Sequence, residues 1–251
     1  MSGDEARPGC YLLGRSRRLD EETQNKIWQQ TELFGLLNHM PVIQFIFPEV
    51  EADDVISAVA QAPIYQGWQK VIISSDKDFF QLLGPDNVVL YRPIQKQFLN
   101  RMRILEEYGI HPTNFAMARA MVGDPSDNLA GIRGIGLPTV SKRLTFMKEE
   151  KSFTFSDIYD HCENVEKKLK IHTNILENKA VIEDNYRLMQ LYSPSISVQS
   201  KEKIKYTLEN ADMGFNKTGV TKIMYEIGFG ELNWSDLAAT MRRISLENSG
   251  N

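Results

Sequence analysis

Short β-branched runs alternate with helical spacing between residues 41 and 93, and this alternation limits the fold more than any other feature. Three of the runs predict strands: PVIQFIF (41–47), KVIIS (70–74) and NVVLYRP (87–93). Between the first two, residues 51–62 place Val55, Ile56 and Val59 on one helical face. Strands that alternate with helices predict an α/β layer, here a mainly parallel sheet with flanking helices.

Helical patterns fill most of the remaining chain. A brief helix is expected after the strand at 70–74 and through Leu83, and helical segments follow residue 100 up to a Ser/Pro-containing break at 192–203. An amphipathic helix is also expected from about Asp20 to Asn38. Its apolar residues are Ile27, Trp28, Leu33, Phe34 and Leu37.

Charge and cysteine content exclude several classes of protein. A net charge of −4 argues against a wholly basic nucleic-acid coat protein, but an enzyme can combine an acidic pocket with local basic patches. Cys10 and Cys162 offer neither a disulfide framework nor a zinc pattern. No apolar run reaches the ~20 residues of a membrane span. We therefore expect a reduced, cytoplasmic setting and no membrane association.

Carboxylates gather at three points of the sequence. The groups are Glu51, Asp53 and Asp54; Asp76 and Asp78; and Asp124 and Asp127. The first two groups directly follow predicted strands. Because α/β proteins bind ligands outside the carboxyl ends of their strands, we expect these acids to converge at that edge of the sheet.

Each group alone has a simpler explanation, since acids near helix N-termini cap the helix and interact favourably with its dipole. That explanation does not predict three groups at one edge. Packed carboxylates repel one another unless a cation neutralises them, and oxygen-rich clusters suit Mg²⁺ or Mn²⁺. Two such ions ~4 Å apart can activate water and stabilise a leaving oxygen in phosphodiester cleavage. The pattern therefore predicts a two-metal site.

Other ligand-binding motifs fail on inspection. Residues 76–78 start like an EF-hand loop, but Phe80 occupies the next ligand position. Gly131 and Gly136 have P-loop spacing, but the required Lys-Ser/Thr pair does not follow them. The glycines are also in the wrong order for a dinucleotide fingerprint, and no strand precedes them.

A glycine-rich turn lies directly after the third acidic group, in GIRGIGLPTVSKRL (131–144). Glycines allow close backbone approach, and free N–H groups at a helix start bind anions. A plain interhelical turn is the simpler explanation. The pattern favours a sequence-independent grip on the DNA backbone. The expected DNA-binding residues are Gly131, Arg133, Gly134, Gly136, Thr139, Lys142 and Arg143.

Three segments strongly resemble the 5′-nuclease family: VEADDVISA (50–58), IISSDKDFFQLL (72–83) and MVGDPSDNLAGIRGIGLPTVSKRL (121–144). This family includes flap endonucleases, phage 5′–3′ exonucleases and the 5′-nuclease domain of bacterial DNA polymerase I. The resemblance covers about residues 40–150 well and the helical remainder loosely, and it is strongest to a phage-type member.

The resemblance implies a PIN-like α/β fold followed by a helical domain with a helix–three-turn–helix motif. It implies metal-dependent 5′–3′ exonuclease or flap endonuclease activity on DNA, or on RNA in RNA–DNA hybrids, in replication or repair. Two Mg²⁺ ions, replaceable by Mn²⁺, are implied at the acids, and K⁺ at the glycine-rich turn. A monomer in the cytoplasm, or in the host-cell cytoplasm for a phage protein, is expected.

The matching acids take their roles from the same resemblance. The implied catalytic residues are Glu51, Asp53, Asp76 and Asp78, and the implied metal ligands are these four with Asp54, Asp124 and Asp127. In the family's first motif the third acid, here Asp54, is usually not a direct ligand.

The N-terminal part departs from the family pattern, because the family's first two strands, each with a metal-binding Asp, are not found before Glu51. We therefore expect an N-terminally truncated member. Residues 1–40 are expected to be the remnant of a basic helical arch, with Arg15, Arg17 and Arg18 as phosphate contacts. Residues 41–110 would form the nuclease core and residues 111–251 the helical DNA-binding domain.

Two further hypotheses stay open beside the nuclease. The chain could be a structure-dependent DNA-binding protein or a fragment with little or no nuclease activity, because the N-terminal metal ligands are missing. It could also be an unrelated metal phosphatase that uses Asp76 and Asp78.

Overall fold

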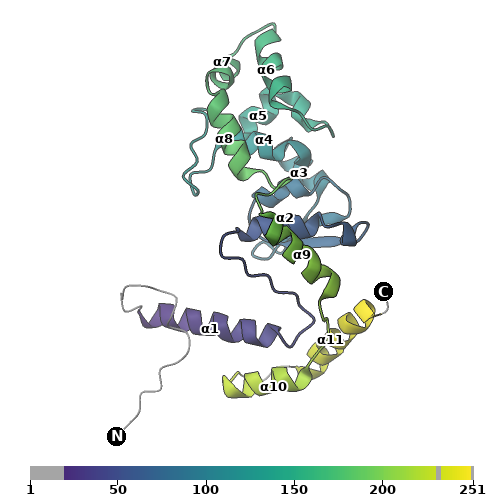
Figure 1. Ribbon diagram of the computed structural model, residues 1–251. Coiled ribbons are helices and arrows are strands. Elements are labelled where there is room, and N and C mark those ends of the chain that lie inside the picture. The colour runs from purple at the N-terminus through teal and green to yellow at the C-terminus, as the bar shows by residue number, and fades with distance from the viewer. Residues whose placement is uncertain (1–19, 230–232, 250–251) are drawn as a thin grey trace. The chain divides into compact units, whose positions relative to one another are not determined.

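The computed structural model describes residues 20–229 and 233–249 of the chain (Figure 1). Contacts within the chain divide it into two compact units, one made of Met1–Gln44 with Asn210–Asn251 and the other of Phe45–Glu209. The three acidic groups and the glycine-rich turn all lie in the second unit. The functional division predicted above, with boundaries after residues 40 and 110, stays a prediction.

The first unit consists of α1 (Glu21–Leu37), α10 (Lys217–Glu226) and α11 (Trp234–Ser249). The helix predicted from Asp20 is confirmed, and the Asp20 carboxylate caps it by accepting the Thr23 N–H at 2.8 Å. Helix α1 packs against α10, yet it has no fully buried residue, and Leu33 and Phe34 are half exposed. None of the described helices combines the length and apolar character that crossing a membrane requires.

The second unit has a small sheet and many helices. Its strands are β1 (Lys70–Ile73), β2 (Val88–Arg92) and β3 (Gln97–Leu99). Its α-helices are α2 (Ala52–Ala60), α3 (Arg101–Tyr108), α4 (Phe115–Val122), α5 (Leu137–Arg143), α6 (Phe155–Asn164), α7 (Lys170–Glu177), α8 (Lys179–Met189) and α9 (Val198–Asn210). Short 3₁₀ helices are η1 (Pro63–Tyr65), η2 (Asp78–Leu82), η3 (Pro112–Asn114) and η4 (Thr145–Lys148).

The sheet is mixed, with strand order β1-β2-β3. Strand β1 runs parallel to β2 in the register Lys70↔Val88, which confirms the two strands predicted here. Strand β3 is antiparallel to β2, with Leu90 opposite Leu99, and was not predicted. The expectation of a mainly parallel sheet is therefore wrong in part, because the chain turns back tightly after β2, where Lys96 adopts a φ of +51°.

The strand predicted at 41–47 is wrong. Residues 42–47 belong to neither a helix nor a strand, and no strand of the described chain pairs with them. Two of their side chains lie together, since the rings of Phe45 and Phe47 stack with centroids 6.1 Å apart. β-branched composition favours an extended backbone, whereas a strand also needs a neighbour to complete its ladder.

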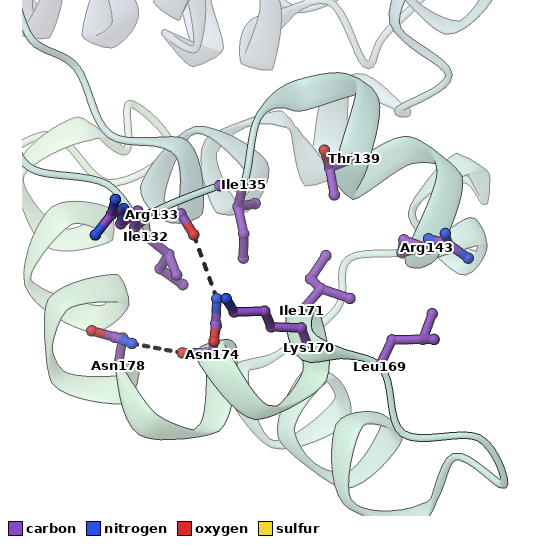
Figure 2. A pocket seen from close by; sticks show the side chains of 11 residues that line it. Ile132, Arg133, Ile135, Thr139, Arg143, Leu169, Lys170, Ile171, Asn174 and Asn178 are labelled. Carbon is purple, nitrogen blue, oxygen red and sulfur yellow. Dashed lines mark hydrogen bonds between the residues drawn. The ribbon is translucent and has the colours of Figure 1, made fainter.

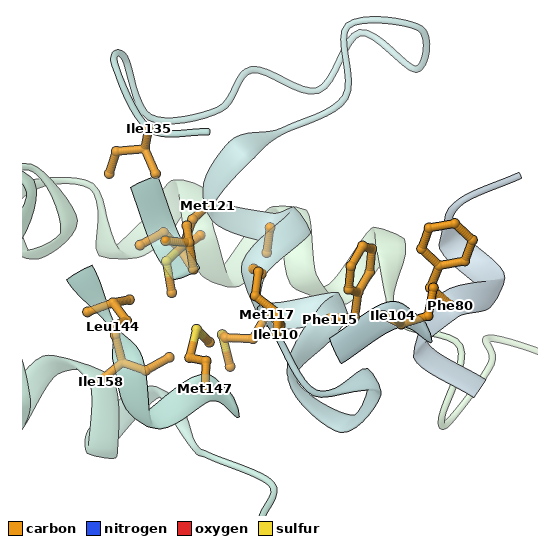
Figure 3. Close-up of a cluster of buried hydrophobic side chains, with 14 of the residues drawn as sticks. Phe80, Ile104, Ile110, Phe115, Met117, Met121, Ile135, Leu144, Met147 and Ile158 are labelled. Carbon is orange, nitrogen blue, oxygen red and sulfur yellow. The ribbon is translucent and has the colours of Figure 1, made fainter. Parts of the chain in front are cut away.

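One hydrophobic core joins the sheet to the helices that follow it (Figure 3). The rings of Phe80 and Phe115 pack edge to face with centroids 5.3 Å apart. From there the core continues along α4, through Met117 and Met121, to Leu144 of the α5 end. Figure 1 shows α4 and α8 side by side, and these helices contact each other closely. This core fixes η2 and α4, the two elements that carry the site.

Candidate active site

Asp78 is held at the end of β1 by its buried neighbours. Phe79 and Phe80 follow it directly and enter the core, so η2 cannot move away from the sheet. Just before it, the Asp76 carboxylate accepts the Asp78 N–H at 2.9 Å, which turns the chain from β1 into η2. Asp76 thus has a local turn-forming role, while the Asp78 side chain is left for another partner.

Asp124 begins a tight loop that returns to α4. Its backbone pairs with Leu129 through two hydrogen bonds of 2.9 and 2.8 Å, and its carboxylate accepts the Ser126 N–H at 2.9 Å. The bonds from Ser126 hold the pKa of Asp124 below its usual range. Gly131 closes the loop against α4, because a Cβ there would lie 1.7 Å from the Val122 carbonyl oxygen. No other residue type fits this position without moving the backbone.

Arg119 of α4 lies between the two acids. Its Nε donates to Asp78 Oδ1 at 3.0 Å, and its Nη2 donates to Asp124 Oδ2. Burial raises the pKa of Asp78, with Arg119 acting in the opposite direction and Asp76 and Asp124 adding to the rise. Burial disfavours the Arg119 charge, but its acidic partners outweigh burial and raise its pKa. One guanidinium therefore allows two partly buried carboxylates to sit together.

Asp78 of the second acidic group meets both members of the third. Carboxylate oxygens of Asp78, Asp124 and Asp127 lie within 4.8 Å of one another, and among the described residues they form the one such group of three or more candidate ligands. Asp127 is exposed, so the cluster opens to solvent. Three oxygen donors, one of them solvent-facing, suit a hard divalent cation that keeps part of its water shell.

The first acidic group lies at the start of α2 and is not part of that cluster. Glu51 is the N-cap residue of α2, but its side chain makes no capping hydrogen bond. Burial raises the pKa of Asp54, and Asp53 and then Glu51 raise it further, so these acids repel one another. The simple capping explanation therefore does not account for Glu51.

Buried polar side chains tie the elements of the site together. Gln81 of η2 donates to the Met189 carbonyl at 3.0 Å and accepts the Leu191 N–H at 2.7 Å. Ser57 and Gln61 of α2 donate to the Leu191 carbonyl. One short segment after α8 thus anchors both α2 and η2, which carry the first and second acidic groups.

A buried asparagine plays the same part for the third group. The Asn185 amide of α8 donates to the Ala120 carbonyl at 3.0 Å and to the Ala130 carbonyl at 2.9 Å. These bonds hold the end of α4 to the loop after Asp127. Sequence reasoning missed Asn185, Gln81 and Arg119. The last had a signal, because it is the single charged residue of the otherwise apolar helix FAMARAMV.

The glycine-rich turn borders a cavity of about 840 Å³ (Figure 2). Gly134 adopts a φ of +81°, which favours glycine, and Gly136 is the N-cap of α5. Of the predicted DNA-binding residues, four line the cavity and Lys142 is exposed nearby on α5. The four are Arg133, Gly134, Thr139 and Arg143. Arg15, Arg17 and Arg18 lie outside the described residues.

Comparison with known proteins shows what the chain is similar to. The family model described as "5'-3' exonuclease, N-terminal resolvase-like domain" matches residues 11–109. A 5'-3' exonuclease of Buchnera aphidicola is 29% identical over 200 residues, which are 79% of this chain and 66% of that protein. The thermostable DNA polymerase I of Thermus aquaticus is 38% identical over 136 residues, 54% of this chain and 16% of the polymerase.

Solved structures share the fold. The bacteriophage T5 5'-exonuclease with bound zinc has a TM-score of 0.57 at 20% identity, over 84% of this chain and 72% of that one. A complex of the bacteriophage T5 flap endonuclease with DNA and metal ions has the same TM-score at 19% identity, over 84% of this chain and 71% of that chain. At these identities the likeness concerns the fold alone.

The fold and the cluster define an α/β protein with a carboxylate site at the end of a strand. The family-model match and the curated relatives show that part of the chain is similar to 5'-3' exonucleases. The chain spans less than two thirds of the length of the curated relatives described above.

Proposed function

We propose that this chain is a divalent-metal-dependent 5′–3′ exonuclease and flap endonuclease that hydrolyses phosphodiesters in DNA replication or repair. The observation that carries the proposal is the convergence of Asp78, Asp124 and Asp127 within 4.8 Å at the end of β1. Asp127 is exposed, so a substrate phosphate would approach the cluster from the solvent side. The curated relatives named as 5'-3' exonucleases support the same activity.

The acids present fit a divalent cation, since they are hard oxygen donors that repel one another when unpaired. Mg²⁺, or Mn²⁺ in its place, would be held by Asp78, Asp124 and Asp127, with Glu51, Asp53, Asp54 and Asp76 as the further predicted ligands of a two-ion site. Such ions, when bound, lower the pKa of water and neutralise charge on the leaving oxygen. The chain's own part is to fix the carboxylates: Arg119 orients two of them, and the buried amides hold their loops.

The glycine-rich turn is proposed to grip the duplex as part of a helix–three-turn–helix motif. Gly134 and Gly136 keep the backbone free of side chains, while Arg133 and Arg143 lie exposed at the cavity. Such contacts position a duplex without reading its bases. A K⁺ ion bound by the turn, a monomeric state and a cytoplasmic location complete the proposal.

The substrates proposed are 5′ flaps and nicked or branched duplexes, with RNA–DNA hybrids as a further class. A 5′-labelled flap incubated with the purified chain tests this. We expect short labelled products with Mg²⁺ or Mn²⁺ and none with EDTA. Absence of cleavage with both metals contradicts the nuclease proposal.

A second candidate function is structure-dependent DNA binding without cleavage. The observation that favours it is Arg119, whose guanidinium already neutralises two of the three clustered acids. A mobility shift of the flapped duplex that persists in EDTA, together with intact DNA after incubation in Mn²⁺, would support binding and exclude the nuclease.

A further inference from the structure

The cavity beside the glycine-rich turn has a second wall, and this wall comes from α7. Lys170 and Asn174 of α7, with Asn178 just after its end, line it opposite Arg133 and Arg143. In Figure 2 the two arginines lie at opposite ends of the view and Lys170 lies between them. Sequence position does not connect α7 with the turn, because Lys170 follows Arg133 by 37 positions.

The three cations have no acidic counterpart. No aspartate or glutamate lines this cavity, and none of the ion pairs found in the described parts of the chain involves Arg133, Arg143 or Lys170. All three side chains are exposed. On a chain with a net charge of −4, an unneutralised group of three cations marks a place where a polyanion is favoured.

The wall is fixed to the turn rather than free to move. The Asn174 amide donates to the Arg133 carbonyl at 3.4 Å, and the Asn178 amide donates to the Asn174 carbonyl at 2.8 Å. At the start of α7, the ring of buried His172 accepts the Leu169 N–H at 3.2 Å. These bonds set the backbone of Lys170 at a constant place relative to the glycine-rich turn.

The floor of the cavity is apolar and rigid. Ile132 and Ile135 from the turn and Ile171 from α7 are all buried and belong to the hydrophobic core. Packed side chains of this kind do not rearrange when a ligand arrives. Cations on a fixed frame lose less conformational entropy on binding than cations on a loop.

We propose that Lys170 is a further phosphate contact, so that the sugar–phosphate backbone of duplex DNA is held between the glycine-rich turn and α7. The inference rests on the proposed function, since it assigns a new residue to the DNA grip. A cavity of about 840 Å³ with cations along its length suits a stretch of backbone better than one small anion. Asn174 serves as a positioning residue, because it joins the two walls.

The size of the effect follows from counterion release. Each phosphate contact on B-DNA contributes about 0.9 to the slope of log affinity against log salt. We take the electrostatic gain of one contact to vanish at about 1 M salt. A slope of about 0.9 then makes that contact worth about eight-fold in affinity at 0.1 M salt. We therefore expect Lys170→Ala to weaken binding about eight-fold near 0.1 M KCl and to reduce the salt slope by about 0.9.

The test measures fluorescence anisotropy of a labelled flapped duplex in EDTA, from about 50 to about 200 mM KCl. Lys168→Ala is the matched control, because Lys168 is exposed two residues earlier and does not line the cavity. Lys170→Arg should restore the slope, and Lys170→Gln gives a second neutral variant should Lys170→Ala fail to fold. Unfolding curves of all four confirm that the fold is intact.

The outcomes separate the two proposals. Weaker binding by Lys170→Ala but not by Lys168→Ala supports the inference, even where the wild-type chain does not cleave and the nuclease proposal fails. Equal affinity and equal salt slope for these two variants overturn the inference, even where the wild-type chain cleaves the flap. Lack of any duplex binding by the wild-type chain also overturns it.

Discussion

Replacing Arg119 by alanine is expected to destabilise the chain strongly, because this side chain neutralises two partly buried acids. Its Nε lies 3.0 Å from Asp78 Oδ1, and the side chains of Arg119, Asp78 and Asp124 are only 13%, 14% and 15% exposed. At an effective dielectric of about 20, one pair at that distance attracts by about 5 kcal/mol before desolvation is subtracted. Breaking a buried ion pair costs about 3–5 kcal/mol of stability. Because these side chains keep some exposure, we expect a loss near the lower end, about 3 kcal/mol.

The destabilisation should depend on pH in a defined direction. In the wild-type chain the pKa of Asp78 is raised, so its contribution to stability is present below the unfolded pKa and is lost as the pH rises through the folded pKa. The pKa of Asp124 is lowered, so its contribution is present above the unfolded pKa and is lost as the pH falls through the folded pKa. Without Arg119 both pKa values rise. The loss of stability should therefore be largest near neutral pH and shrink as the pH falls toward about 4.

Urea unfolding followed by circular dichroism at neutral and acidic pH measures this loss. Arg187→Ala is the control, since Arg187 pairs with Asp184 at 3.4 Å with both side chains mostly exposed, and its removal should change stability by less than about 0.5 kcal/mol. The reasoning is refuted by a loss below about 1 kcal/mol for Arg119→Ala at neutral pH, or by a loss that grows on acidification.

Three further predictions concern the cluster, the glycines and the buried amide. Asp124→Asn combined with Asp127→Asn should reduce flap cleavage at least about 100-fold while duplex binding in EDTA persists; unchanged cleavage would remove these acids from the site. Gly131→Ala should cost about 3 kcal/mol or more in urea unfolding, because its methyl group meets a carbonyl oxygen at 1.7 Å, whereas Gly134→Ala, with open space but a φ of +81°, should cost about 1–2 kcal/mol. Equal costs would contradict that distinction. Asn185→Leu leaves two backbone carbonyls without their donor and should lower the unfolding free energy by about 3 kcal/mol, and a change below about 1 kcal/mol would count against this role.

Much of the site was predictable because its signals are local. The strands at 70–74 and 87–93 follow from β-branched composition, and Asp76 and Asp78 lie shortly after the first of them. The glycine-rich turn also follows from composition, since its glycines lie between two helical patterns. Such features depend on neighbours within a few positions, so the sequence carries them directly.

Other features needed partners that are distant in the sequence. Residues 41–47 have strand composition but no neighbouring strand in the described chain. Strand β3, in contrast, is a strand because it pairs antiparallel with the free edge of β2.

The sequence by itself determined the two strands at 70–74 and 87–93 and the acids that follow the first of them, because those choices rest on local composition. Only the tertiary structure decided that Arg119 joins Asp78 to Asp124, that Asn185 fastens their loop, and that Lys170 faces the glycine-rich turn. Apart from the bond between Arg119 and Asp124, these contacts connect residues far apart along the chain. Their physical reason is packing: a buried charge or amide must find a partner, and the core decides which partners come within reach.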